Sequence, residues 1–312
     1  MTVLYWLEGI RTPALDAFFS AVTHLGSETA LLAVAIVIFW CISKKDGYFL
    51  MSVGFLGTMI NQFLKLLCRV PRPWVKDPAF TIVESAREGA AGYSFPSGHT
   101  QSVMATLGCP ARSSKNWLLR IVCILLIALT AVSRMYLGVH TPLDVGVSLI
   151  IGAVLLWKLY PAFEKSDEDL RPMLTVLVTL AMLSVAFVVY MNVRSWPEDI
   201  DPHNLASGLK NSWQMLGCCW GMLVAFVVEK RWVDFDSRAP WWAQILKTAA
   251  GLALVLALKA GLKPVLNLLF FGHVSATALR YFLLVIFAAD VWPLTFPWFS
   301  AGCPLRGRRA KR

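Results

Sequence analysis

The chain has 312 residues, of which 57% are hydrophobic and 15% are charged. So few charges among so many apolar runs exclude a water-soluble domain of this length and predict an integral membrane protein. The formal net charge is +10, and in a membrane protein the position of the positive residues bears on function more than their sum.

The first residues, MTVLYWLEGIRTPALDAFF, do not have the composition of a signal peptide. Glu8, Arg11 and Asp16 fall inside this segment and interrupt the apolar core that a signal peptide needs. We therefore expect residues 1–19 to form an amphipathic helix that lies on the membrane surface.

The apolar runs that follow approach or reach the roughly 20 residues that cross about 30 Å of hydrocarbon. They predict an all-α fold, a polytopic membrane helical bundle with about nine transmembrane helices. The predicted spans lie near residues 29–43, 48–67, 96–111, 116–134, 141–161, 171–192, 211–229, 242–260 and 278–298. Residues 1–165 carry nearly all the unusual polar chemistry, and residues 166–312 are expected to add further spans and a basic cytoplasmic tail.

Lysine and arginine are concentrated on one side of this predicted bundle. The loops SKKDG, ARSSKNWLLR, EKSDEDLRP and EKRWVDFDSR and the tail RGRRAKR all fall there. Short cytoplasmic loops are rich in these residues, so this side and the C-terminus are predicted to be cytoplasmic, while the N-terminus and loop 68–95 face outward. We expect a bacterial cytoplasmic membrane. Directly after an apolar span, the basic tail predicts contact with anionic lipid and not with nucleic acid.

Other polar features of the spans indicate packing. The seven cysteines are scattered, without the paired spacing of a disulfide framework or a metal site. Asp290 lies within the last span, where a carboxylate usually has a partner, and Lys259 is the candidate for an ion pair. No cofactor is expected, and the oligomeric state is not indicated by the sequence.

Three segments at the predicted outer edge carry polar groups that are costly there. The first is KLLCRVPRP, in which Lys65 lies near the outer end of the second span and Arg72 lies between Pro71 and Pro73. Taken alone, a lysine that extends to the interface and an interfacial arginine are ordinary.

The second segment is YSFPSGHT. Pro96 and Ser97 mark the start of a helix, Gly98 lets a ligand approach the backbone, and His99 lies in the first turn. The free N–H groups and partial positive charge of such a terminus suit a phosphate. The alternative is a simple capped helix with an interfacial histidine.

The third segment is SRMYLGVHTPLD. Thr141 can cap the fifth span and Asp144 follows three residues later, so the two form a plausible capping box. His140 immediately precedes this start, close enough for Asp144 to hold one ring nitrogen and leave the other as a nucleophile. Arg134, at the end of the fourth span, can return to the same place across a short turn.

Together the three segments predict an active site for phosphoryl transfer to a histidine. Cationic side chains and a helix terminus suit a phosphoryl group whose charge spreads over three oxygens, and two histidines supply separable roles. The predicted phosphate-binding residues are Lys65, Arg72, Ser97, Gly98 and Arg134. His99, His140 and Asp144 could instead hold a metal, but the neighbouring cations would repel it.

The sequence resembles the type 2 phosphatidic acid phosphatase superfamily, whose signature is K-x6-R-P, then P-S-G-H, then S-R-x5-H-x3-D. Every spacing is matched, by Lys65, Arg72 and Pro73, by Pro96 to His99, and by Ser133, Arg134, His140 and Asp144. The resemblance implies a metal-independent phosphatase in which His140 attacks phosphorus, Asp144 orients it, and His99 protonates the leaving oxygen. A phosphohistidine would then be hydrolysed by water.

The resemblance leaves the substrate open. A site at the membrane boundary favours a lipid phosphate such as phosphatidate, sphingoid-base phosphate, phosphatidylglycerol phosphate or polyprenyl diphosphate. The stretch NLASGLKNSWQMLG, residues 204–217, is similar to the glucose-6-phosphatase branch, and the number of spans also resembles the sphingosine-phosphate phosphatases. The alternatives are therefore a sugar-phosphate phosphatase, a lipid phosphotransferase, and a transporter; a transporter would leave the three-part motif unexplained.

Overall fold

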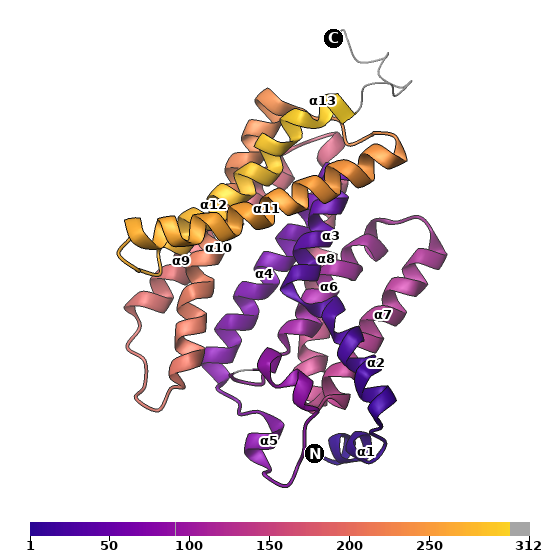
Figure 1. The fold of residues 1–312 in the computed structure, drawn as a ribbon, viewed down its shortest axis with the longest axis vertical. Coiled ribbons are helices and arrows are strands. Elements are labelled where there is room, and N and C mark those ends of the chain that lie inside the picture. The colour runs from indigo at the N-terminus through magenta and orange to yellow at the C-terminus, as the bar shows by residue number, and fades with distance from the viewer. Residues whose placement is uncertain (91, 300–312) are drawn as a thin grey trace.

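The computed structural model of the chain describes residues 1–90 and 92–299, and every regular element in these ranges is helical (Figure 1). The all-α prediction is thereby confirmed. Seven helices of the described ranges are long and apolar enough to cross a membrane, and each overlaps a predicted span. They are Lys44–Lys76, Trp117–Tyr136, Pro142–Asp167, Arg171–Val193, Pro202–Val233, Trp241–Leu269 and Ala276–Phe299.

The other two predicted spans are shorter helices. α3 (Glu28–Cys41) has 14 residues and α6 (Gly98–Ser113) has 16, fewer than the roughly 20 that a bilayer requires. α6 packs against α4 (Lys44–Cys68), α7 (Trp117–Tyr136) and α8 (Pro142–Glu164). Because these neighbours surround it, α6 can carry buried polar residues that a lipid-facing helix could not.

The N-terminal segment differs from the single surface helix that we expected, which is not confirmed. It forms two helices, α1 (Thr2–Gly9) and α2 (Pro13–Thr23). Together, residues Pro13–Gly26 and Glu28–Cys41 are long and apolar enough to form one membrane span that is bent by 52°. Counting this broken span raises the number of candidate spans to eight. The bend lies where Ser27 caps α3 and so interrupts the helical hydrogen-bond ladder.

The C-terminal half contains α9 (Arg171–Val193), α10 (Pro202–Val228), α11 (Trp241–Leu269) and α12 (Ala276–Ile286). α10 and α12 approach so closely that a Cβ atom on Gly217 would lie 2.1 Å from the carbonyl oxygen of Ala278. α11 runs obliquely to α4 and α10 (Figure 1).

The predicted ion pair between Asp290 and Lys259 is wrong. Neither carboxylate oxygen of Asp290 has a hydrogen-bond partner in the described ranges. The Lys259 Nζ atom instead lies 5.8 Å from the centre of the Tyr281 ring. Six cysteines of the described ranges are free.

One end of the bundle collects the segments that carry the sequence motifs. α1, α5 (Pro73–Lys76) and the loop that leads into α6 lie there, together with the turn between α7 and α8 (Figure 1). The basic tail of residues 306–312 lies outside the described residues. The bundle thus brings the end of α4, the start of α6 and the turn between α7 and α8 to one end (Figure 1).

Candidate active site

Backbone hydrogen bonds join the three motif segments. The Ser94 N–H donates to the Val70 carbonyl at 2.7 Å, which ties the loop before α6 to the loop after α4. The Ser97 N–H donates to the Asp144 carbonyl at 3.2 Å, which ties the start of α6 to the start of α8. The predicted convergence of the three segments is therefore present in the fold.

His140 lies at the centre of these segments, and 2% of its surface is exposed. Its Nδ1 atom is 3.4 Å from Asp144 Oδ2, and its Nε2 atom is 3.0 Å from Arg72 Nη1. A guanidinium can only donate, so Nε2 is the unprotonated nitrogen and Nδ1 carries the proton toward Asp144. The lone pair of Nε2 thus points toward the guanidinium of Arg72.

Asp144 both caps the start of α8 and faces the imidazole of His140. The Thr141 N–H donates to its Oδ2 atom at 2.8 Å while the Asp144 N–H donates to Thr141 Oγ1, so the predicted capping box is confirmed. The Ser94 hydroxyl donates to the same carboxylate oxygen. These bonds fix the carboxylate that faces the imidazole.

Arg72 is held rigidly by backbone carbonyls. Its Nε atom donates to the Gly92 carbonyl and its Nη1 atom to the Val139 carbonyl, each at 2.8 Å. The side chain is 5% exposed. Two bonds to separate loops fix the direction of the guanidinium, as an anion site of defined geometry requires.

Arg134 is held differently. Its Nη1 atom donates to Thr23 Oγ1 at 2.6 Å, from the end of α2. Its Nε and Nη2 atoms are buried and have no partner in the described part of the chain. A buried cation with unused donors is unfavourable by itself, and it suits a bound anion.

The remaining predicted phosphate-binding groups lie on α4 and at the start of α6. Lys65 Nζ donates to the Tyr93 carbonyl at 2.7 Å. Ser97 caps α6 and accepts from Thr100 Oγ1 at 2.9 Å. A Cβ atom at Gly98 would meet only Asn61 Oδ1, at 3.9 Å, so the first turn of α6 stays open to a ligand.

Electrostatics keep His140 neutral. Burial lowers the pKa of its imidazole well below the usual value, and the positive charges of Arg72, Arg134 and Lys65 lower it further. His99 contributes in the same direction. We call Lys65, Arg72 and Arg134 the cationic cluster, and its charge explains why a neutral nucleophile can persist beside it.

His99, in the first turn of α6, lines a cavity of about 330 Å³ between α3, α4, α6 and α10. The turn before α3 packs against it so closely that a Cβ atom on Gly26 would lie 2.4 Å from the His99 carbonyl oxygen. His99 therefore borders a space large enough for part of a substrate, and the positive charges of the cationic cluster act on its imidazole.

The sequence reasoning missed the residues that hold the site in place. Thr23 binds Arg134, Ser94 binds Asp144, and the carbonyls of Gly92 and Tyr93 bind Arg72 and Lys65. Ser94 lies inside the quoted YSFPSGHT stretch, and that proximity was the one available signal. Thr23 is 111 positions from Arg134, and no spacing rule connects them.

Comparison with known protein families finds two matches in this chain. Residues 47–168 match the PAP2 superfamily. Residues 213–304 match a second family, described as PAP2 superfamily phosphatase, transmembrane extension. The first match contains all three motif segments, and the second contains most of α10, α11 and α12.

Several characterised proteins are similar to part of the chain. Phosphatidylglycerophosphatase B of Bacillus subtilis is 28% identical over 52% of this chain and 81% of its own length. Undecaprenyl-diphosphatase BcrC of Bacillus subtilis is 30% identical over 49% of this chain and 78% of its own length. A dihydrosphingosine 1-phosphate phosphatase of Schizosaccharomyces pombe is 26% identical over 57% of this chain, which spans 47% of that protein.

Among solved structures, the crystal structure of Aquifex aeolicus LpxE is similar, with a TM-score of 0.45 and 25% identity. The similarity covers 50% of this chain and 91% of that one.

Proposed function

Because this chain belongs to the PAP2 superfamily, we propose that it is a phosphatase that hydrolyses a lipid phosphate through a phosphohistidine intermediate. The relatives compared above are named as lipid phosphatases, and the apolar helices make this chain an integral membrane protein. The observation that carries the proposal is the position of His140, with Asp144 at one ring nitrogen and Arg72 at the other.

In the first step the phosphoryl group of the substrate takes the place beside the cationic cluster and the start of α6. His140 Nε2 attacks phosphorus, and the bond from phosphorus to the lipid oxygen breaks. Burial and the charges of Arg134 and Arg72 lower the pKa of His99 to about 3 in the free protein, so His99 takes up its proton when the anionic phosphoryl group binds. His99 then gives this proton to the leaving oxygen, and Asp144 stabilises the positive charge that develops on His140. The cationic cluster and the backbone at Gly98 stabilise the charge on the three phosphoryl oxygens.

In the second step water attacks the phosphohistidine. His99, now neutral, accepts a proton from the water, the bond from phosphorus to nitrogen breaks, and phosphate leaves. His140 returns to the neutral state. No metal takes part in this proposal, because three cationic side chains supply the charge that a metal would otherwise supply.

We assign the chemistry to residues 1–165 as a phosphatase core, and regard residues 166–312 as additional spans that shape the substrate site. We propose an active site on the outer side of a bacterial cytoplasmic membrane, with the N-terminus outside and the C-terminus inside; the lysine- and arginine-rich loops support this orientation. A site at that depth can receive a headgroup sideways from the bilayer. Phosphatidate, sphingoid-base phosphate, phosphatidylglycerol phosphate and polyprenyl diphosphate are the candidate substrates.

The first test is phosphate release by the purified protein in detergent micelles with chelator present. Each of the four lipid candidates and glucose 6-phosphate is offered, and the protein is quenched to trap a labelled phosphoenzyme. We expect release from a lipid substrate and an acid-labile, base-stable phosphoenzyme. Loss of activity with chelator would contradict the metal-independent mechanism. Label that moves to an added lipid alcohol and not to water would indicate a phosphotransferase.

A further inference from the structure

The cavity beside His99 is lined by both apolar and polar side chains, and five of the polar ones are amides. We call it the polar chamber and define it by Asn61 and Gln62 of α4, Gln101 of α6, and Asn211 and Gln214 of α10. Glu28, at the start of α3, also lines it and accepts a hydrogen bond from Gln214. α10 belongs to the second half of the chain, so the chamber is built by both halves.

Two side chains of the polar chamber lack hydrogen-bond partners. Asn61 is 4% exposed and Gln101 is 3% exposed. The Asn61 Nδ2 atom, and both the Nε2 and Oε1 atoms of Gln101, have no partner in the ranges that the structure describes. Buried amides are almost always hydrogen-bonded, so donors and acceptors that line a cavity indicate a polar occupant.

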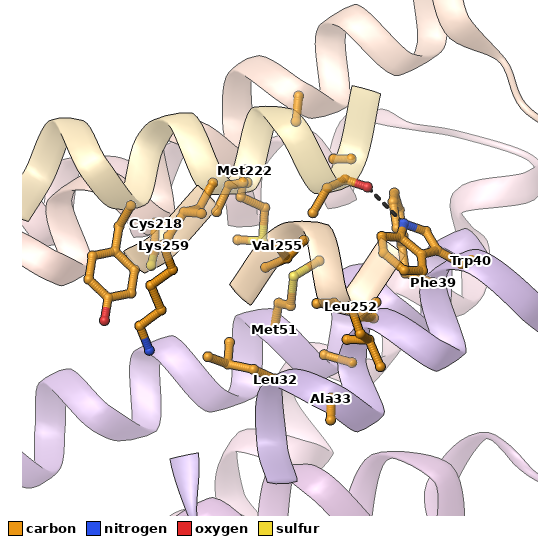
Figure 2. Close-up of a pocket in the computed structure, with 18 of the residues that line it drawn as sticks. Leu32, Ala33, Phe39, Trp40, Met51, Cys218, Met222, Leu252, Val255 and Lys259 are labelled. Atoms are coloured by element: carbon orange, nitrogen blue, oxygen red, sulfur yellow. Dashed lines mark hydrogen bonds between the residues drawn. The ribbon is translucent and has the colours of Figure 1, made fainter. Parts of the chain in front are cut away.

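A second pocket, of about 240 Å³, is mainly apolar (Figure 2). Leu32, Met51, Met222, Leu252 and Val255 point into it from α3, α4, α10 and α11, as Figure 2 shows. The two cavities share four lining residues, which are Leu32, Phe55, Cys218 and Tyr281. The two spaces are therefore neighbours across these four side chains, and His99 lines only the polar one.

We propose that this pair of cavities binds the leaving alcohol of the substrate. The polar chamber takes hydroxyl, ester or amino groups on the carbons next to the phosphoester, and the apolar pocket takes the start of an alkyl chain. The inference rests on the proposed function, in which His99 protonates the leaving oxygen. Among phosphomonoesters it selects a glycerolipid phosphate or a long-chain-base phosphate over a polyprenyl monophosphate. A polyprenyl diphosphate is not selected against, because its leaving group is a polyprenyl phosphate whose oxygens can meet the polar chamber.

The selection follows from the unpartnered amides. In the free protein a polar cavity of this size holds water, which satisfies Asn61 and Gln101. A glycerol or amino-alcohol backbone can replace those hydrogen bonds when it displaces the water. The isoprenoid chain of a polyprenyl monophosphate has no such group, so its binding would leave the amides buried and unsatisfied.

The test measures binding of the alcohol itself, so that it does not depend on turnover. Thermal unfolding of the wild-type protein in detergent is followed with dioctanoylglycerol, sphingosine, farnesol and glucose. We expect the first two to raise the midpoint in a saturable way, and farnesol and glucose to leave it unchanged. Farnesol has a chain but no polar group beyond its hydroxyl, so it tests the need for groups that bind the polar chamber. Glucose is polar but has no alkyl chain, so it tests the need for a chain in the apolar pocket.

The matched variants are Gln101→Met, which has nearly the same shape without the amide, and Thr106→Val on the same helix. Thr106 is buried but does not line either cavity. We expect Gln101→Met to reduce the apparent affinity for the polar alcohols about tenfold, while Thr106→Val retains it. Equal stabilisation by farnesol, stabilisation by glucose alone, or an unchanged affinity in Gln101→Met would overturn the proposal.

These outcomes separate the inference from the proposed function. If the polar alcohols bind and Gln101→Met weakens them, but no lipid phosphate is hydrolysed, the cavities are a polar-alcohol site and only the catalytic proposal fails. If lipid phosphates are hydrolysed but no alcohol stabilises the protein, the catalytic proposal stands and the subsite proposal fails.

Discussion

Two residues of the cationic cluster, Arg72 and Lys65, and two residues of the polar chamber, Asn61 and Gln101, are held in opposite ways. Arg72 is tied to two backbone carbonyls and Lys65 to a third. Asn61 and Gln101 in the chamber have unpartnered amide atoms within the described ranges. Arg72 and Lys65 are therefore fixed in direction before a phosphoryl group binds, whereas Asn61 and Gln101, like the free donors of Arg134, await hydrogen bonds from what binds.

The largest effect is expected from removing the nucleophile. His140→Ala should lower phosphate release by at least about 10⁴-fold, because no other group in the cationic cluster can accept the phosphoryl group. Steady-state kinetics on a hydrolysed lipid measure this, and circular dichroism checks that the helices persist. His273→Ala, at an exposed histidine outside the site, is the matched control and should retain activity. An active His140→Ala would refute the mechanism.

A smaller loss is expected when the orienting carboxylate is neutralised. Asp144→Asn should lower kcat between about 10²- and 10³-fold, because the nucleophile remains but its tautomer and orientation are no longer fixed. It should also lower stability by about 1 kcal/mol, since the carboxylate is part of the α8 capping box. A loss as large as that of His140→Ala would mean that Asp144 does more than orient.

Removing the buried guanidinium of Arg134 should affect catalysis and stability in opposite directions. Arg134→Met should lower kcat/KM about 10²-fold and weaken inhibition by inorganic phosphate, because donors for the phosphoryl oxygens are lost. The unfolding midpoint without phosphate should stay the same or rise, because a buried cation with unused donors is removed. Arg194→Met, at an exposed arginine of the 194–201 loop, is the control. Strong destabilisation would indicate that Arg134 is chiefly structural.

The smallest effect concerns pH. Burial and the cationic cluster lower the pKa of His140, so its ring stays neutral as pH falls through the usual histidine value of about 6.5. In the pH profile of kcat/KM, we therefore expect the decrease on the acidic side that is due to the enzyme to lie below about pH 6.5. The ionisation of the substrate is measured separately by phosphorus NMR and removed from the profile. An acidic limb above that value would show that the cluster does not act on His140 as described.

Several features were predictable because they depend on residues close in sequence. The capping box of Thr141 and Asp144 and the pairing of His140 with Asp144 are both contacts within one helical turn. Seven of the predicted spans were confirmed because an apolar run of sufficient length leaves a helix few alternatives in a bilayer. The spacing of the motifs also indicated that their side chains share one end of the bundle.

Other features depend on which helices become neighbours. α6 is short and polar, and only its position between α4, α7 and α8 makes such a helix stable in the bundle. The Asp290 prediction failed for a related reason, because two charges in adjacent spans meet only if the helices turn the right faces to each other.

The sequence by itself determined the helical class, most of the spans and the residue types of the candidate site, because these follow from local apolar length, capping and spacing. Tertiary structure decided which groups hold those residues, as with Thr23 on Arg134 and Ser94 on Asp144. It also decided that α10 faces α4 and α6 across the polar chamber. A cavity exists only between packed elements, so neither its shape nor its unpartnered amides can be read from one helix at a time.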